Sequence, residues 1–258
     1  MQMNTYFTEI ITGLFLPFAG TALGAAAVFM LNKNTGKKTN SILSGFAAGI
    51  MTAASVWSLL LPAAELATDQ GIPEWLPCFA GFSAGVLFIV LTDVVADRIM
   101  KRESSDGNHF LLAFAVTLHN IPEGMAVGAA LAGMTAENPT VTTASAMSLC
   151  IGIAIQNIPE GAVISAPLCA EGKKKTASFI LGMLSGAVEP VGALLTLVLT
   201  SLILPALSYL LAFAAGAMIY TVFCELAPEI RTKESGISGA LGASAGFALM
   251  MLLDIAFS

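Results

Sequence analysis

Two seven-residue stretches of the sequence place polar side chains in the middle of long apolar runs. They are LHNIPEG at Leu118–Gly124 and IQNIPEG at Ile155–Gly161. In the first, His119 and Glu123 are four residues apart, so both project from one face of a helix. The second stretch repeats this spacing with a glutamine and a glutamate. The repetition predicts two matching polar patches on two apolar helices.

The polar residues of both stretches, with one further carboxylate, form a candidate cation site. A charge at the centre of a bilayer costs about 2.5–3.5 kcal/mol, so buried carboxylates without Lys or Arg nearby are either protonated or bind a cation. Imidazole, carboxylate and amide oxygen together suit a divalent transition metal such as Zn²⁺, Fe²⁺ or Mn²⁺. A Na⁺ or Ca²⁺ site has little use for a histidine. The candidate ligands are His119, Asn120, Glu123, Gln156, Asn157, Glu160 and Glu189.

Prolines and glycines at fixed places in these stretches fit a metal site. Pro122, Pro159 and Pro190 each free a backbone carbonyl one turn earlier, and in lipid that oxygen must be satisfied by protein, water or an ion. Gly124 and Gly161 allow a neighbouring helix to approach closely. We therefore expect the two stretches to be facing halves of one intramembrane site.

The composition is that of a polytopic membrane protein. The 258 residues are 56% hydrophobic and 11% charged, and the mean hydropathy is +0.83. A soluble domain carries about 25% charged residues, so this chain has too little polar surface to be solvated by water. We expect an all-α protein in a lipid bilayer, with no nucleic-acid partner.

Eight apolar runs are long enough to cross a membrane, which takes roughly 20 residues each. The connectors between them are short, so we expect a single transmembrane transporter domain over residues 1–258. The eight predicted helices lie at about 8–31, 41–66, 77–100, 109–133, 141–168, 176–200, 206–229 and 236–257.

All eleven basic residues fall in the odd-numbered connectors or, for Arg98, at the helix end beside the third connector. Lys and Arg are retained on the cytoplasmic side of a membrane. With eight spans, both termini are then extracytoplasmic. The short, loop-poor chain favours a bacterial inner membrane.

A second internal echo indicates an inverted repeat. FAAGIM at Phe46–Met51 resembles FAAGAM at Phe213–Met218, and the second and seventh helices run in opposite directions. The first three helices would then match the last three around the central fourth and fifth, as in secondary transporters that work by alternating access. The alternative is a chance match between Ala- and Gly-rich helices.

The two motifs, the Glu-Pro pair of the sixth helix and the eight-span layout resemble the ZIP family of divalent metal transporters, particularly its GufA-like prokaryotic branch. The resemblance implies uptake of Zn²⁺, and often of Fe²⁺, Mn²⁺ or Cd²⁺, into the cytosol, with the metal as substrate and no cofactor. It also implies a two-metal centre with bridging glutamates. One site would use His119, Glu123, Gln156 and Glu160; the adjoining one would use Asn120, Asn157 and Glu189.

Three further residues are weaker candidates. Met51 sits where some relatives place a thioether ligand, although methionine is also a common core filler. Asp93 and Glu225 could line the metal pathway, although solvation of a helix end is an alternative for Glu225. The chain departs from the family in two places: His109 stands in for a histidine-rich loop, and Asn157 replaces an aspartate found in some relatives. We expect weaker metal binding at the second site.

Two other functions are less compatible with the sequence. A proton-coupled carrier of a small organic cation would be expected to have aromatic residues near its carboxylates, and no Trp or Tyr flanks either motif. An intramembrane metalloprotease would need an HExxH pair, which is absent from the sequence. Small residues on the helix faces make a homodimer plausible.

Overall fold

The computed structural model describes residues 6–30, 37–100, 108–136, 141–170, 172–199, 204–230 and 237–257. Within these ranges the side chains of residues 96–100 and 108–119, and of a few single positions, lie outside the described part. Every regular element in the described ranges is helical. The elements are α1 (Phe7–Ala26), η2 (Ala27–Phe29), α2 (Lys37–Ala54), η3 (Ser55–Leu60), α3 (Leu61–Asp69), α4 (Trp75–Met100), α5 (Asn108–Thr135), α6 (Thr143–Ala170), α7 (Lys175–Ser185), α8 (Val188–Val198), η4 (Leu204–Ala206), α10 (Leu207–Thr221), η5 (Val222–Leu226), α11 (Ala227–Ile230) and α12 (Ser238–Phe257).

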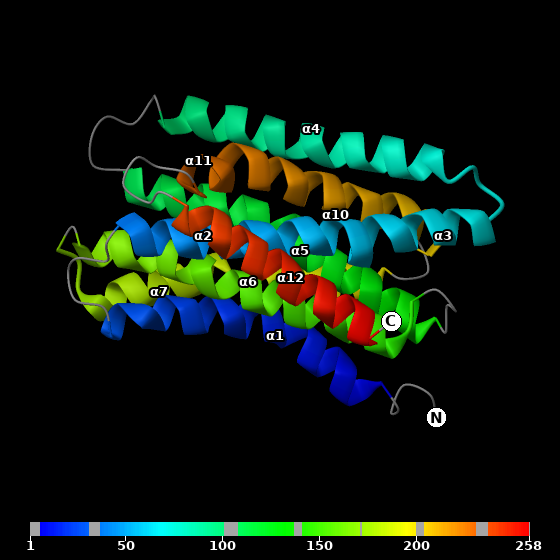
Figure 1. Cartoon of the computed structure of the whole chain (residues 1–258), viewed down its shortest axis with the longest axis horizontal. Helices are drawn as coiled ribbons and strands as arrows, with labels where there is room; N and C mark the ends of the chain where they lie inside the picture. The colour runs from blue at the N-terminus through cyan, green and yellow to red at the C-terminus, as the bar shows by residue number, and fades with distance from the viewer. Residues whose placement is uncertain are drawn as a thin grey trace.

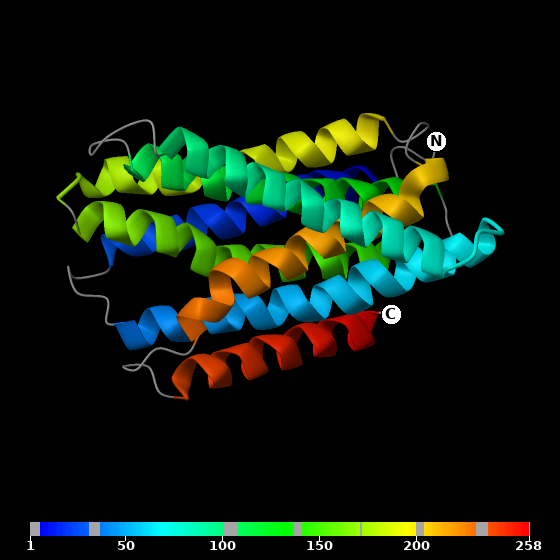
Figure 2. The same cartoon turned by 90° about the horizontal axis from the view of Figure 1, so that it is seen from above.

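The helices lie side by side along the long axis of one bundle (Figure 1). The helices that carry the two motifs, α5 and α6, run through its middle, between α4 and α10 on one side and α1 and α7 on the other (Figure 1). The most extensive packing joins α2 to α12, α1 to α6, α4 to α10 and α5 to α8. α1 begins and α12 ends at the same end of the bundle, as both views agree (Figures 1 and 2).

Seven segments of the described residues are long and apolar enough to cross a membrane. Each coincides with one of the predicted spans: Phe7–Phe29, Ser41–Asp69, Trp75–Val95, Thr143–Ala166, Lys175–Val198, Leu207–Leu226 and Ser238–Ala256. The remaining predicted span, 109–133, falls on α5, many of whose side chains lie outside the described part. The all-helical membrane prediction is confirmed; the count of eight stays a prediction.

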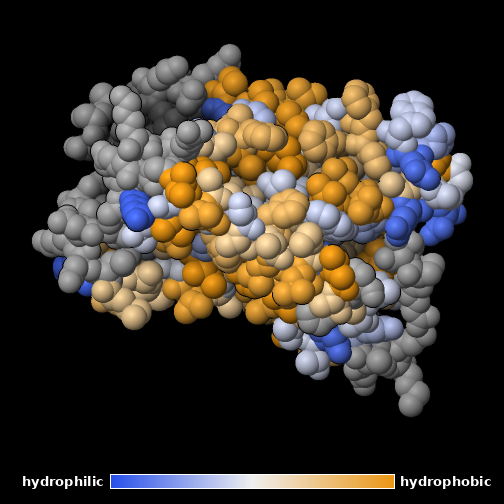
Figure 3. Space-filling view, in the orientation of Figure 1, coloured by the Kyte–Doolittle hydropathy of each residue, from blue (hydrophilic) through white to orange (hydrophobic). Residues whose placement is uncertain are grey.

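Hydropathy follows the same axis as the helices. On the face shown in Figure 3, apolar residues occupy the middle of the bundle and hydrophilic residues gather toward its two ends. This distribution suits a molecule whose middle is surrounded by lipid and whose ends meet water.

The predicted helix at 176–200 is interrupted, because the chain turns at Gly186 and Ala187 between α7 and α8. Pro190 has no N–H with which to pair the Gly186 carbonyl four residues earlier. The N–H of Glu189 donates to that carbonyl instead, at 3.1 Å. The break places Glu189 in the first turn of α8, in the interior of the bundle.

Two predicted helices contain π-helical turns, which hydropathy does not reveal. These are η3, between α2 and α3, and η5, between α10 and α11. In sequence, η3 begins nine residues after Phe46 (46 to 55) and η5 nine residues after Phe213 (213 to 222), so both follow the FAAGxM echo at the same spacing. π-helical turns inside α-helices are frequent at functional sites.

Candidate metal centre

The candidate ligands whose side chains are described lie inside the bundle, as polar residues of membrane helices usually do. Five of them expose 3% or less of their surface: Asn120, Glu123, Gln156, Asn157 and Glu189. Glu160 is half-buried, and the side chain of His119 lies outside the described residues. Hydrogen bonds between their side chains connect residues of α5, α6 and α8.

The glycine that ends each motif lets the neighbouring helix come close. A side chain at Gly124 would collide with the backbone of Glu189 on α8, and one at Gly161 with the backbone of Thr21 on α1. Only glycine permits backbone contact of this kind between membrane helices. α8 is therefore held against α5, and α1 against α6, at the level of the polar residues.

Glu123 and Gln156 form the first donor group, across the interface of α5 and α6. Nε2 of Gln156 donates to Oε1 of Glu123 at 2.6 Å. The remaining oxygens, Oε2 of Glu123 and Oε1 of Gln156, are buried and have no hydrogen-bond partner among the described residues. Buried polar atoms nearly always have a hydrogen-bond partner. Because these two oxygens have none in the described part of the chain, they are candidates to coordinate a cation inside the bundle.

Glu189 is the centre of a second donor group. Its Oε1 accepts from Nδ2 of Asn120 at 3.0 Å and from Oγ1 of Thr21 at 3.2 Å. Its Oε2 accepts from Nδ2 of Asn157 at 2.9 Å. Hydrogen-bond donors from α1, α5 and α6 thus meet at the Glu189 carboxylate, at the start of α8. These hydrogen bonds stabilise the carboxylate in the apolar interior of the bundle.

The carboxylates of the two groups interact electrostatically. Glu123 interacts with the charges of Glu160 and Glu189, and Glu189 also interacts with the charge of Glu160. In the described part of the chain, no three His, Cys, Asp or Glu side chains come close enough to hold a metal ion on their own. A metal site built from the described residues would therefore take amide oxygens as well as carboxylates as ligands. The side chain of His119 lies outside these residues.

The three weaker candidates lie on other helices. Met51 of α2 is 6% exposed and packs in the hydrophobic core. Asp93 of α4 is in hydrogen-bonding contact with Tyr220 near the end of α10. Glu225 is half-buried in η5, the π-helical turn that follows. The packing of α4 on α10 thus brings the helices of Asp93 and Glu225 together.

Asp254, on α12, was not singled out from the sequence. Its carboxylate is 7% exposed, and its Oδ1 accepts from Oγ of Ser58 at 2.6 Å and from Oγ of Ser148 at 3.5 Å. A carboxylate in the last apolar run was its only signal. The two serine partners, on η3 and α6, could not be inferred without the fold.

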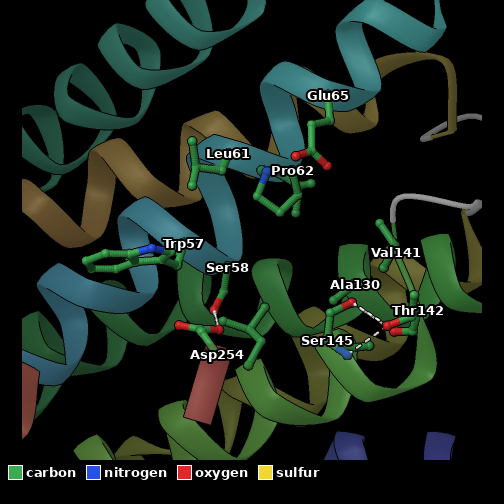
Figure 4. Close-up of a pocket in the computed structure, with 13 residues that line it drawn as sticks. Trp57, Ser58, Leu61, Pro62, Glu65, Ala130, Val141, Thr142, Ser145 and Asp254 are labelled. Atoms are coloured by element: carbon green, nitrogen blue, oxygen red, sulfur yellow. Dashed lines mark hydrogen bonds between the residues drawn. The ribbon is translucent and has the colours of Figure 1, made fainter. Parts of the chain in front are cut away.

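Asp254 lines a cavity of about 250 Å³ between η3, α3, α5, α6 and α12. Glu65 and Ser58 face the cavity from one side, and Thr142 and Ser145 from the other (Figure 4). On α5, the lining residue Ala130 is two helical turns from Glu123, about 10 Å at 1.5 Å per residue. On α6 the same interval separates the lining residue Leu149 from Gln156.

A bundle of apolar helices with a buried group of carboxylates and amides is typical of a membrane transporter. Comparison with known proteins also indicates a membrane transporter. A family model described as ZIP Zinc transporter matches residues 104–254. Zinc transporter ZIP11 of Homo sapiens is 31% identical over 340 residues, with 99% of each chain covered.

Two bacterial proteins are similar over most of this chain. Zinc transporter GufA of Myxococcus xanthus is 35% identical, covering 92% of this chain and 95% of its own. Zinc transporter ZIPB of Bordetella bronchiseptica is 34% identical, covering 93% and 78%. The chain belongs to the ZIP zinc transporter family. The predicted resemblance and the predicted class, a divalent metal ion transporter and not an enzyme, are confirmed.

Proposed function

We propose that the protein carries divalent transition-metal ions, Zn²⁺ first among them, into the cytosol through the site on α5, α6 and α8. The observation that carries this proposal is a pair of buried oxygens, one on Glu123 and one on Gln156, that accept no hydrogen bond from any described residue. Both belong to the repeated motif, and Glu160 and His119 lie within one turn of them on the same two helices. Fe²⁺, Mn²⁺ and Cd²⁺ have similar ligand preferences and are the other candidate substrates.

The second donor group would bind metal more weakly than the first. Both oxygens of Glu189 already accept hydrogen bonds from amide N–H groups, those of Asn120 and Asn157. An amide at position 157 also brings no charge, whereas an aspartate would. A second ion there would have to share Glu189 with these N–H donors. The first group instead offers Oε2 of Glu123 and Oε1 of Gln156, which accept no hydrogen bond from a described residue.

We further propose eight spans, α5 among them, arranged as an inverted repeat. The packing supports this: α2 lies on α12 as α10 lies on α4, and α1 lies on α6 as α8 lies on α5. The matched π-helical turns η3 and η5 fit the same relation. α1, α5, α6, α7 and α8 would move as one bundle against α2, α4, α10 and α12, giving alternating access.

The distribution of basic residues supports extracytoplasmic termini in this arrangement, and the bacterial relatives support a bacterial inner membrane. The cavity at Asp254 would then open on the extracytoplasmic side, since α12 ends there. Its two carboxylates, of Glu65 and Asp254, would attract cations toward the site two turns deeper. A homodimer through small-residue helix faces is compatible with this layout.

Zinc binding to the detergent-solubilised protein tests the proposed site. We expect a saturable Zn²⁺ isotherm that Glu123→Ala weakens at least about 100-fold, because a charged ligand is lost. Glu74→Ala, which removes an exposed carboxylate between α3 and α4, is the matched control and should bind as the wild type does. Equal binding by folded Glu123→Ala and wild type would refute the site. Binding of an organic cation but not of Zn²⁺ would favour the alternative carrier.

A further inference from the structure

Thr21 of α1 faces the metal centre from a helix that carries no motif. Its side chain is fully buried, and its Oγ1 donates to Oε1 of Glu189 at 3.2 Å, with the Pro17 carbonyl of its own helix as a more distant acceptor at 3.5 Å. The turn between α7 and α8 closes around it, because a side chain at Gly186 would lie 2.6 Å from this same oxygen. A β-branched residue has few allowed rotamers, so the hydroxyl is held in a defined place beside the carboxylate.

The proposed inverted repeat gives Thr21 a counterpart. Gly161 ends the second motif against the backbone of Thr21, as Gly124 ends the first against the backbone of Glu189. Thr21 and Glu189 therefore hold corresponding positions on α1 and α8. One half of the repeat contributes a carboxylate at this position and the other half contributes a hydroxyl, and the two are hydrogen-bonded to each other.

α1 also sets the direction of the Asn157 amide. The backbone carbonyl of Pro17 accepts from Nδ2 of Asn157 at 3.3 Å, and Oε2 of Glu189 accepts from the same nitrogen at 2.9 Å. Both N–H groups of the amide are thereby used. Its Oδ1 is buried and has no hydrogen-bond partner in the part of the chain that the structure describes.

We propose that Thr21 is a positioning residue for the second donor group: its hydroxyl fixes the Glu189 carboxylate and thereby sets how tightly a divalent cation binds beside Asn120 and Asn157. This inference rests on the proposed metal centre. Thr21 does not need to touch the ion, because its effect passes through Glu189. A carboxylate already held in place loses less side-chain freedom when it becomes a ligand.

The test measures Zn²⁺ binding to the purified full chain by equilibrium dialysis, with Zn²⁺ alone as the probe. Thr21→Val keeps the shape of the side chain and removes the hydroxyl; Thr21→Ser keeps the hydroxyl. We expect Thr21→Val to lower the weaker of two Zn²⁺ affinities about tenfold, the size of one hydrogen bond to a charged group. In Thr21→Val the stronger affinity should stay within about twofold of its wild-type value. In Thr21→Ser the weaker affinity should also lie within about twofold of its wild-type value.

Thr135→Val is the matched control, since the Thr135 hydroxyl donates to the Ala132 carbonyl of its own helix at 3.0 Å. Thr21→Ala replaces Thr21→Val if the valine variant does not fold. In a Glu189→Gln background, Thr21→Val should change the weaker affinity by less than about twofold, because the two residues act as a unit.

The outcomes separate this inference from the proposed function. Two affinities unchanged by Thr21→Val, or both lowered equally, would overturn the inference, as would a Thr21→Ser variant as weak as Thr21→Val. One Zn²⁺ site that Glu123→Ala removes would also overturn it, while leaving the proposed transport site standing. No Zn²⁺ binding by folded wild type would refute both.

Discussion

At the residue scale, the pairing of amides with carboxylates decides which oxygens remain for a metal. Nε2 of Gln156 donates to Glu123, and one oxygen on each of the two side chains has no hydrogen-bond partner among the described residues. Asn157 uses its Nδ2 on Glu189, so the charge of Glu189 is already compensated in part. Two chemically similar groups therefore differ in their need for a cation.

Replacing Asn157 by aspartate tests this difference. Asn157→Asp removes a 2.9 Å donor from Glu189 and adds a like charge beside it. We expect the metal-free variant to lose about 1–3 kcal/mol of stability, the cost of an unsatisfied buried group. Zn²⁺ should then raise its melting temperature in detergent by several degrees more than it raises that of the wild type, because the ion binds and stabilises the folded state.

Asn157→Ala is the control for this prediction, since it removes the donor without adding charge. It should be destabilised in the absence of metal and show no larger zinc effect than the wild type. A zinc effect no greater in Asn157→Asp than in Asn157→Ala would contradict the role assigned to the amide.

At the element scale, close contact of α1 with α6 and of α8 with α5 holds the metal centre together. Gly161→Ala should separate α1 from α6, because its Cβ would collide with the Thr21 carbonyl. We expect a loss of about 1–3 kcal/mol, the usual cost of overpacking. The measurement is the temperature at which half of the detergent-solubilised protein stays monodisperse after heating.

Gly192→Ala on α8 is the matched control, because its Cβ would meet no atom closer than 3.5 Å. Alanine favours a helix over glycine by up to about 1 kcal/mol, so this variant should be as stable as the wild type or more so. If the two alanine variants were equally stable, the proposed close contact of α1 and α6 would be wrong.

Much of the element layout could be predicted from the sequence, because span length and the repeated motifs are local signals. The break before Glu189 and the π-helical turns η3 and η5 were not predicted, since averaging hydropathy over about 20 residues hides changes of one turn. Thr21 and Asp254 were missed for another reason. Each acquires its role from a partner on a distant helix, Glu189 for Thr21 and Ser58 for Asp254.

At the scale of the whole molecule, topology depends on whether α5 crosses the membrane. Eight spans place the sequence between α4 and α5 on the cytoplasmic side and the start of α6 on the other. We expect Ser105→Cys to react with an impermeant thiol reagent only after cells are permeabilised, and Thr142→Cys to react in intact cells. Both variants need a background in which the four native cysteines are replaced by alanine.

Lys173→Cys, at an exposed position between α6 and α7, provides the control for a cytoplasmic loop. It should behave as Ser105→Cys does. Labelling of Ser105→Cys and Thr142→Cys from the same side would show that α5 does not cross, and the inverted repeat would then be wrong.

Zinc uptake into proteoliposomes tests the central claim most directly. Purified wild type, Glu160→Ala and the control Glu74→Ala are reconstituted, and entry of ⁶⁵Zn²⁺ is followed over time. We predict saturable uptake by the wild type and by Glu74→Ala. Folded Glu160→Ala should take up zinc no faster than protein-free liposomes do, because it lacks the carboxylate that is expected to bridge the two metal sites. Uptake by Glu160→Ala at the wild-type rate would contradict transport through this site.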